Sequence, residues 1–333
     1  MERQINQLPK VELHSHLEGT MQPTLVRRIA KRNGVALKED LFTQQDTFAW
    51  HDFVTFLQAF DEASCCLRQS EDYRDIMYEY LKSCSADGAI YAETFISPDH
   101  ANELGISYDD VLTGCVQGID DAERDFNILG RVIVTCVRHL GPQRAMVVAQ
   151  QMVDNPHPYF VGFGMGGNEN MHNLADFLPA YQIAADAGYP CTVHAGEVCG
   201  PESVWDAINH LPISRIGHGV RCVEDEELMR TLVQRSIALE ICPSSNLALS
   251  IYSDWPSHPL KQILEAGISI SLNSDDPPFF CTSVGQEYQY SALHFNLQIE
   301  QLQEISRMAI RSSFADNLTK KRLISLIDQH NYS

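Results

Sequence analysis

The stretch Lys10-Val-Glu-Leu-His-Ser-His-Leu-Glu-Gly19 begins like a buried strand and ends in polar residues. Side chains alternate along a strand, so His14 and His16 should point to one face and their neighbours to the other. Two imidazoles on one face at the C-terminal end of a strand can hold one metal ion. Two partly buried histidines satisfied by hydrogen bonds would leave the same pattern, so H-x-H alone is a weak signal.

Seven more short apolar runs follow this one, and the segments between them carry apolar residues at helical spacing. Strands that alternate with helices predict a parallel sheet, and eight of them can close into a TIM-type (β/α)8 barrel. A doubly wound open sheet is the alternative, but no glycine-rich phosphate motif follows the first strand. We predict strands at residues 11–17, 89–96, 131–137, 160–165, 191–195, 215–217, 238–242 and 269–273.

The spacing of the strands is uneven, because about seventy residues separate the first two. We expect extra helices there, inserted at about residues 19–87 and covering the mouth of the barrel. No internal repeat, low-complexity segment or linker divides the chain. One domain over residues 1–333 is therefore the simplest prediction.

The composition narrows the partners and the location of the protein. Acidic residues outnumber basic ones by 44 to 24, for a net charge of −20. Such a charge repels phosphate backbones and anionic membranes, so nucleic acid and membranes are not expected partners. The ten cysteines form no C-x-x-C pair, and no stretch approaches the roughly 20 apolar residues of a membrane helix or opens like a signal peptide. We expect a cytoplasmic protein with a small neutral substrate.

Two further motifs lie where the fifth and sixth predicted strands end. In Thr192-Val-His194-Ala-Gly-Glu197, a glycine allows a tight turn that swings Glu197 over the barrel mouth, beside a possible ligand in His194. In Arg215-Ile-Gly-His218-Gly219, the glycines let a ligand approach His218 closely. For Glu197, the alternative is a helix whose first turn favours an acidic residue. For His218, the alternative is a turn with an incidental histidine.

The end of the eighth strand carries Ser271-Leu-Asn-Ser-Asp275-Asp276-Pro-Pro278. Adjacent carboxylates face different ways, so one can bind metal while the other addresses the substrate. A helix start is the alternative here. The four motifs all fall at C-terminal strand ends, where barrel enzymes place their active sites. Three histidines and one carboxylate suit zinc and leave room for a water; the set is His14, His16, His194 and Asp275.

In their order, and across nearly the whole chain, these motifs resemble the adenosine deaminase family of the amidohydrolase superfamily. A fifth match is Gly164-Met-Gly-Gly-Asn-Glu169, in which Gly167 takes the position whose backbone N–H holds purine N3 in that family. Phe53, Phe56, Leu57 and Phe60 form one helical stripe that resembles the apolar helix over the family's purine pocket. The alternative for this stripe is ordinary helix core.

The resemblance implies a reaction and a role for each motif. One zinc per chain, held by the set above, would polarise a water that attacks purine C6. His218 and Asp275 would orient that water and help to remove its proton. Protonated Glu197 would donate to N1, which requires a raised pKa, and Asp276 would bind N7. The product is the 6-oxo purine plus ammonia.

Glu18 departs from the family pattern. Adenosine deaminases usually carry an aspartate there, which binds the ribose 5′-hydroxyl, whereas related adenine deaminases carry a glutamate. The segment around Gly167 instead resembles the nucleoside enzymes, because adenine deaminases tend to have a Ser-Ser-Glu run there. We therefore expect deamination of adenosine and deoxyadenosine, the former to inosine, with adenine or another 6-aminopurine nucleoside as the alternative. A solvated loop carboxylate is the plain interpretation of Glu18.

Three other classes of protein share part of this pattern. The cytidine-deaminase class needs a P-C-x-x-C motif after H-x-E, and the chain has none. Two-metal barrel hydrolases that cleave amides or phosphoesters often bridge the metals with a lysine, and predicted strands four and five contain no lysine. A purine-binding protein without turnover stays open, although the intact Glu197, His218 and Asp275 argue against lost activity.

Overall fold

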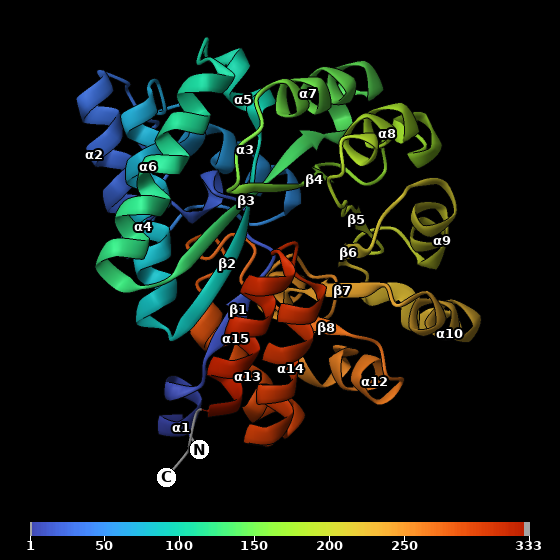
Figure 1. The fold of residues 1–333 in the computed structure, drawn as a ribbon. Helices are drawn as coiled ribbons and strands as arrows, with labels where there is room; N and C mark the ends of the chain where they lie inside the picture. Colours follow the sequence, from blue (N-terminus) through green and yellow to red (C-terminus); the bar gives the residue numbers. More distant parts are fainter. Residues whose placement is uncertain (1, 330–333) are drawn as a thin grey trace.

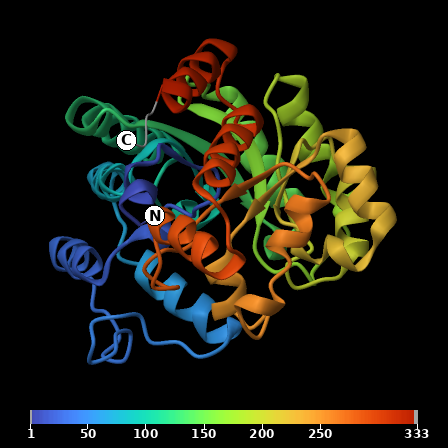
Figure 2. The same cartoon turned by 90° about the horizontal axis from the view of Figure 1, so that it is seen from below.

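The computed structural model describes residues 2–329. Its strands lie at the centre of the molecule and its helices surround them, as Figures 1 and 2 show. All strand pairs are parallel, in the order β1-β2-β3-β4 and β5-β6-β7-β8. The strands are β1 (Lys10–Glu12), β2 (Ala89–Ile96), β3 (Leu129–Val137), β4 (Phe160–Gly166), β5 (His194–Ala195), β6 (Arg215–His218), β7 (Ala238–Ile241) and β8 (Ile270–Leu272).

Two parallel bridges join these two sets of four strands. Phe163 pairs with Cys191 between β4 and the residues before β5, and Ser15 pairs with Asp275 between the ends of β1 and β8. The second junction is held by hydrogen bonds from His16 N to Asp275 O and from Asp275 N to His14 O, at 3.0 and 3.2 Å. The circuit of eight parallel strands is therefore complete, and the predicted TIM-type barrel is confirmed.

Two predicted strands differ from the observed ones by more than two residues at one end. The first was expected to run from residue 11 to 17, but β1 ends at Glu12, because the N–H of Leu13 donates to the side chain of Asn273 (2.8 Å) instead of to a strand neighbour. Beyond Glu12 the chain pairs with its neighbours only through isolated β-bridges, such as the one between His16 and Phe95. The fifth strand shrinks from residues 191–195 to His194–Ala195. Both histidine-bearing ends still reach the barrel mouth.

Fifteen α-helices cover the barrel within the described residues. Several begin at a side-chain cap: Ser107 accepts from Asp110 N before α6, and Asp225 accepts from Leu228 N before α10. The helices outside the first long connection are α1 (Glu2–Gln7), α5 (Pro98–Glu103), α6 (Tyr108–Phe126), α7 (Pro142–Asp154), α8 (Leu178–Asp186), α9 (Pro201–His210), α10 (Glu226–Arg235), α11 (Pro243–Ala248), α12 (Leu260–Glu265), α13 (Val284–Phe295), α14 (Ile299–Ser312) and α15 (Asn317–Gln329).

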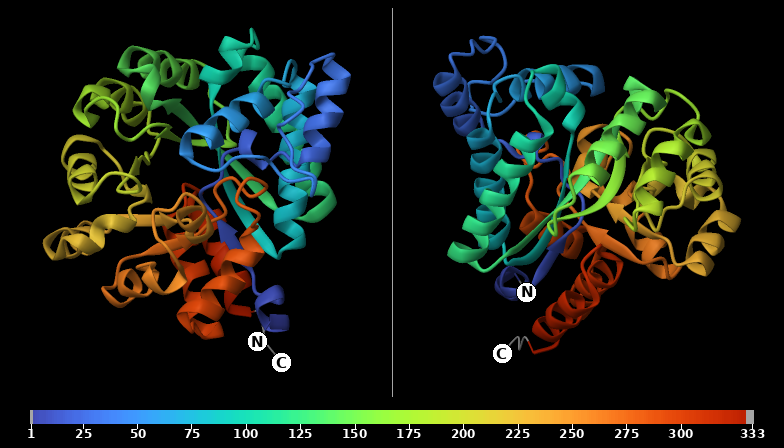
Figure 3. Two further views of the ribbon diagram at one scale, coloured as in Figure 1. Left: turned by 180° about the vertical axis from the view of Figure 1, so that it is seen from behind. Right: turned by 45° about the horizontal axis from the view of Figure 1, so that its top comes forward.

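Helices also fill the long connection between β1 and β2. They are the short 3-10 turn Glu18–Thr20, α2 (Pro23–Asn33), α3 (Phe53–Ser64) and α4 (Ser70–Ala86). A reciprocal capping box between Asp52 and Thr55 starts α3. Figure 3 (left) shows this blue segment crossing in front of the central strands in the view from behind.

None of the helices in residues 2–329 combines the length and the apolar character needed to cross a membrane. The helices instead pack their apolar faces against the strands, as in α14, where Leu302, Ile305 and Ile310 are fully buried. Figure 1 shows α13 and α14 beside β1 and β8, so these two helices cover that side of the barrel.

Candidate metal-dependent active site

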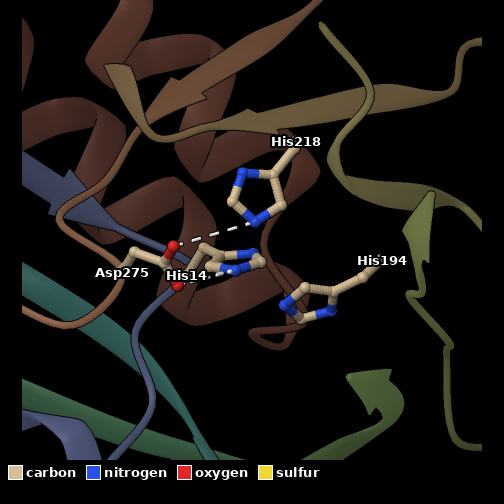
Figure 4. A group of neighbouring side chains, drawn as sticks. All are labelled: His14, His194, His218 and Asp275. Carbon is tan, nitrogen blue, oxygen red and sulfur yellow. Dashed lines mark ion pairs between the residues drawn. The ribbon is translucent and has the colours of Figure 1, made fainter. Parts of the chain in front are cut away.

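Five predicted side chains from four different strand ends meet at the mouth of the barrel, namely His14, His16, His194, His218 and Asp275. Figure 4 shows all of them except His16. The Nε2 atoms of His14 and His16 each lie 3.4 Å from Asp275 Oδ1. The Nε2 atoms of His16 and His194 are 3.2 Å apart. Ligand atoms of His14, His194, His218 and Asp275 all lie within 4.8 Å of one another. The structure thus brings the four predicted metal ligands and His218 together at one place.

The outer nitrogens of two histidines are fixed by hydrogen bonds. His14 Nδ1 lies 2.7 Å from Glu240 Oε2, and His194 Nδ1 donates to the carbonyl oxygen of Met165 at 2.8 Å. These bonds turn both Nε2 atoms toward the cluster, as in histidine metal ligands. His14 Nε2 is buried without a hydrogen-bond partner. An orphaned imidazole nitrogen beside a carboxylate fits a metal ion.

The charges around the cluster favour a cation as well. Burial lowers the pKa of His14, but the nearby carboxylates of Asp275 and Glu240 outweigh this and raise it to about 10. The site therefore attracts a positive charge at this position. Burial and the neighbouring histidines hold the pKa of His194 well below its ordinary value, so His194 is neutral and keeps a free lone pair.

Backbone strain accompanies the two motifs that carry His218 and Asp275. Both residues have left-handed backbone, with φ of 59° and 63°, which is uncommon for residues other than glycine. A Cβ atom at Gly217 would lie 2.7 Å from Cε1 of His14, so only glycine fits before His218. The flanking glycine predicted to allow close approach thus makes room for a neighbouring histidine.

A buried ionic network below the cluster holds Glu240 in place. Arg215 donates from Nε to Glu240 and from Nη1 to Glu93, both at 2.6 Å. Thr192 adds a hydrogen bond to the same Glu240 oxygen at 3.0 Å. Glu93 and Glu240 were not among the predicted site residues; each is a carboxylate inside a predicted strand, and that is the signal by which they could have been found.

A chain of hydrogen bonds behind His218 fixes which of its nitrogens carries the proton. The N–H of Leu260 donates to His258 Nδ1 (3.2 Å), so neutral His258 carries its proton on Nε2, which contacts Asn246 Oδ1 (3.1 Å). The amide nitrogen of Asn246 then donates to His218 Nδ1 (3.2 Å). Burial lowers the pKa of His258 and His218 to about 3, so both are neutral. His218 accordingly presents an Nε2–H to the site.

The carboxyl groups of Glu197 and Asp275 both lie near that N–H. His218 Nε2 is 3.6 Å from Glu197 Oε1 and 3.8 Å from Asp275 Oδ2, and Ser245 also donates to Asp275 Oδ2 at 2.7 Å. Burial, then the charges of Asp275 and Glu169, raise the pKa of Glu197 well above its ordinary value. A glutamic acid that stays protonated in a buried site can act as a proton donor.

Asp276 has a similar environment on the other side of Asp275. Burial and the charge of Asp275 raise its pKa well above the ordinary value, and its Oδ1 has no hydrogen-bond partner among the described residues. The two adjacent carboxylates thus differ in their contacts: Asp275 lies against His14 and His16, while Asp276 Oδ1 has no hydrogen-bond partner among the described residues.

A cavity of about 160 Å³ opens next to the cluster. All the predicted substrate-contacting residues line it, namely His16, Glu18, Phe53, Phe56, Leu57, Phe60, Gly167 and Asp276. Polar residues that were not predicted also line it, among them Ser97, His100 and His139. The signal of these three residues in the sequence is weak, because they follow strands β2 and β3 without a recognisable motif, with His100 in α5 and His139 in a short 3-10 turn.

Glu18 is buried at 2% exposure, so its interpretation as a solvated loop carboxylate is wrong. Its Oε1 accepts from the N–H of Ser97 at 3.1 Å. Burial raises the pKa of Glu18, and the nearby His100 opposes that shift. The side chain thus forms a polar wall of the cavity.

Comparisons with known proteins agree with this geometry. The family model described as adenosine deaminase matches residues 9–330. An adenine deaminase of Agrobacterium fabrum is 42% identical over 318 residues, which cover 96% of this chain and 97% of that protein. The crystal structure of an adenine deaminase from Arthrobacter aurescens superposes with a TM-score of 0.89 at 29% identity, covering 97% of this chain and 98% of that one.

A zinc-bound amidohydrolase from Burkholderia ambifaria has the same TM-score of 0.89, at 27% identity over 98% of this chain and 92% of that chain. The residues of the histidine cluster thus fit a metal ion by their own geometry, and a protein of the same fold contains one. Together with the match over nearly the whole sequence, this places the chain in the adenosine deaminase family of the amidohydrolase superfamily, as an aminohydrolase.

Proposed function

We propose that the protein hydrolyses the 6-amino group of free adenine, giving hypoxanthine and ammonia with the help of one zinc ion. Adenine has an N9–H that a nucleoside lacks, and the buried carboxylate of Glu18 can accept a hydrogen bond from it. That carboxylate on the cavity wall carries the proposal. The cavity volume of about 160 Å³ supports a small base, since pockets for drug-sized ligands measure about 300–1,000 Å³. The name of the relatives also supports it.

The proposed ligands of the zinc are His14, His16, His194 and Asp275. His218 is left out because its Nε2 carries a proton toward the site and offers no lone pair there. Three imidazoles and one carboxylate suit zinc, and the zinc-bound relative supports this choice. When bound there, the ion would supply an acidified water near neutral pH.

The other residues act on the purine and on the attacking water. Glu197 donates its proton to N1, which makes C6 more electrophilic. Asp276 donates to N7, and the backbone N–H of Gly167 donates to N3. Asp275 accepts the proton of the water, because His218 can only donate from Nε2. The proton held by Asp275 then passes to the leaving amino group, and the C6 hydroxyl group returns its proton to Glu197. Ammonia therefore departs as C6 becomes the carbonyl, and both carboxyl groups regain their starting states.

We also propose that the helical insertion at about residues 19–87 closes over the substrate within one domain. Phe56 and Phe60 of α3 are buried and line the cavity together with Phe53 and Leu57, which are half-buried. An apolar cover keeps water away from Glu197 and Asp276, whose protonated forms depend on burial.

The test is a comparison of kcat/KM for adenine with that for adenosine and deoxyadenosine, using zinc-loaded protein. Adenosine is the alternative, because the segment around Gly167 resembles the nucleoside enzymes. The proposal expects adenine to react fastest. Faster turnover of adenosine would reassign Glu18 to the ribose. A failure of all three purines to react, with zinc bound, would refute deamination of these substrates.

A further inference from the structure

The loop that carries Glu197 has an unusual hydrogen-bond acceptor. Four consecutive backbone N–H groups, those of Gly196 to Cys199, all donate to the carboxylate of Glu169. The donors from Val198 and Cys199 lie 2.8 Å from Oε2, and that from Glu197 lies 3.3 Å away. The hydroxyl of Ser203, in the first turn of α9, adds a fifth bond at 2.6 Å.

These four N–H groups have no alternative acceptor. None of them takes part in a backbone–backbone hydrogen bond within residues 2–329. The loop bends sharply, with Gly196 at φ 69°, so it cannot satisfy its N–H groups as a helix or strand would. Glu169 is itself only 5% exposed. The conformation of the loop therefore depends on one buried carboxylate that lies far from it in the sequence.

Glu169 is fixed from its own side as well. It lies two residues after Gly167, in the loop that follows β4. The guanidinium of Arg138 donates to the carbonyl oxygens of Met171 and His172, at 2.6 and 2.9 Å, and so braces the same loop. A rigid loop thus carries both Gly167 and the acceptor for the neighbouring loop.

We propose that Glu169 is a positioning residue for the reaction: it sets the position of the Glu197 side chain relative to the backbone of Gly167. A purine must meet both groups at once, at N1 and at N3, so their separation must match the ring. Glu169 itself touches neither the substrate nor the proposed metal ligands. This inference rests on the proposed function, because it assumes that Glu197 and Gly167 both contact the purine.

The charge of Glu169 adds to this effect. Its negative charge is one of the groups that raise the pKa of Glu197, after burial and Asp275. The same carboxylate that fixes the loop thus helps to keep the proton donor protonated. A neutral amide in its place would lose both effects, although its size and shape are nearly unchanged.

The experiment compares Glu169→Gln with two other variants. The amide has one acceptor oxygen, and its NH2 group faces donors, so the loop should lose most of its bonds. We expect kcat on adenine to fall about 100-fold with little change in KM and with zinc content unchanged. Ser203→Ala removes a single bond and should lower kcat only slightly. Glu202→Gln is the matched control, since Glu202 is an exposed carboxylate that accepts one N–H, from Gly200 (3.1 Å), next to the same loop.

Hydrogen exchange of the amides at residues 196–199 gives a second measurement that needs no substrate. We expect these amides to be protected in the wild type and in Glu202→Gln, and to exchange faster in Glu169→Gln. Unchanged protection together with unchanged kcat in Glu169→Gln would overturn the inference, and so would an equal effect of Glu202→Gln. If Glu169→Gln does not fold, Ser203→Ala takes its place in the test. Unaltered protection of the amides at residues 196–199 together with unaltered kcat in Ser203→Ala would then count against the inference. The wild type could instead show the expected exchange pattern but no activity on any purine. That outcome would refute the proposed function and would support only a structural role of Glu169 in holding residues 196–199.

Discussion

Glu240 Oε2 lies 2.7 Å from His14 Nδ1, and both side chains are fully buried inside the barrel. The carboxylate fixes the ring of His14 so that Nε2 faces the histidine cluster. Arg215 binds the other oxygen of Glu240 at 2.6 Å and so prevents the carboxylate from turning away. Metal affinity in this protein should thus depend on a residue that does not touch the metal.

We expect Glu240→Gln to weaken zinc binding by about 10- to 100-fold, because the amide no longer orients and polarises His14. Competition with a chromogenic chelator measures the affinity. Glu265→Gln, at an exposed residue of α12, is the control and should bind zinc like the wild type. Equal affinity in Glu240→Gln and the control would contradict the role of Glu240.

Replacement of the proposed proton donor should separate chemistry from metal binding. Glu197→Gln should keep the fold and the zinc content but lose about 10²- to 10⁴-fold in kcat, because only the acidic proton is removed. Metal analysis and steady-state kinetics on the same preparation check this. Near-normal turnover would show that another group protonates N1.

The pH dependence of the reaction follows from the raised pKa of Glu197. Its active form is the protonated acid, so activity is present below the raised pKa and is lost as the pH rises through it. We expect a descending basic limb in the profile of kcat/KM for adenine. Glu197→Gln should lack this limb in its residual activity, since the amide does not titrate in this range. The same limb in the variant would assign it to a different group.

Glu18 should control the choice between base and nucleoside. Glu18→Asp shortens the side chain by one methylene and opens space at the cavity wall for a ribose. We expect the ratio of kcat/KM for adenine to that for adenosine to fall at least about 10-fold, the usual effect of one methylene in a pocket. Glu103→Asp, outside the cavity, controls for general effects. An unchanged ratio would mean that Glu18 does not contact the N9 side of the purine.

Buried Glu287 should make the folded state less stable at neutral pH than in mild acid. Burial raises its pKa from 4.5 to about 7, against hydrogen bonds from Ser244 and Thr282. Between these values the unfolded carboxyl is ionised and the folded one is protonated, so the folded state binds more protons and stability falls as the pH rises. The loss approaches about 3 kcal/mol by pH 7.

The variant Glu287→Gln mimics the protonated acid and should remove that dependence. Its free energy of unfolding, from urea titrations at pH 5, 6 and 7, should fall less over this range than that of the wild type. Glu265→Gln should keep the wild-type slope, because Glu265 is exposed. Parallel slopes in the wild type and Glu287→Gln would show that Glu287 titrates normally.

The sequence alone determined the eight strands, their parallel order and the motifs at their C-terminal ends. These features are local: apolar runs of strand length, helical spacing between them, and histidines and carboxylates placed at the ends. That information predicted that His14, His194, His218 and Asp275 would meet, because a parallel barrel brings all C-terminal strand ends to one mouth.

Tertiary structure alone decided what surrounds those residues. Glu169 meets the N–H groups of Gly196 to Cys199 from some 30 positions away, and His14 meets Glu240 across 226 positions, and no local pattern records either contact. The early end of β1 depends on the side chain of Asn273, 260 residues from Leu13. The raised pKa values of Glu197 and Asp276 result from burial and from neighbouring charges. Both conditions exist only after the chain has folded. The sequence therefore supplies the titratable groups, and the packing of the folded chain sets their protonation.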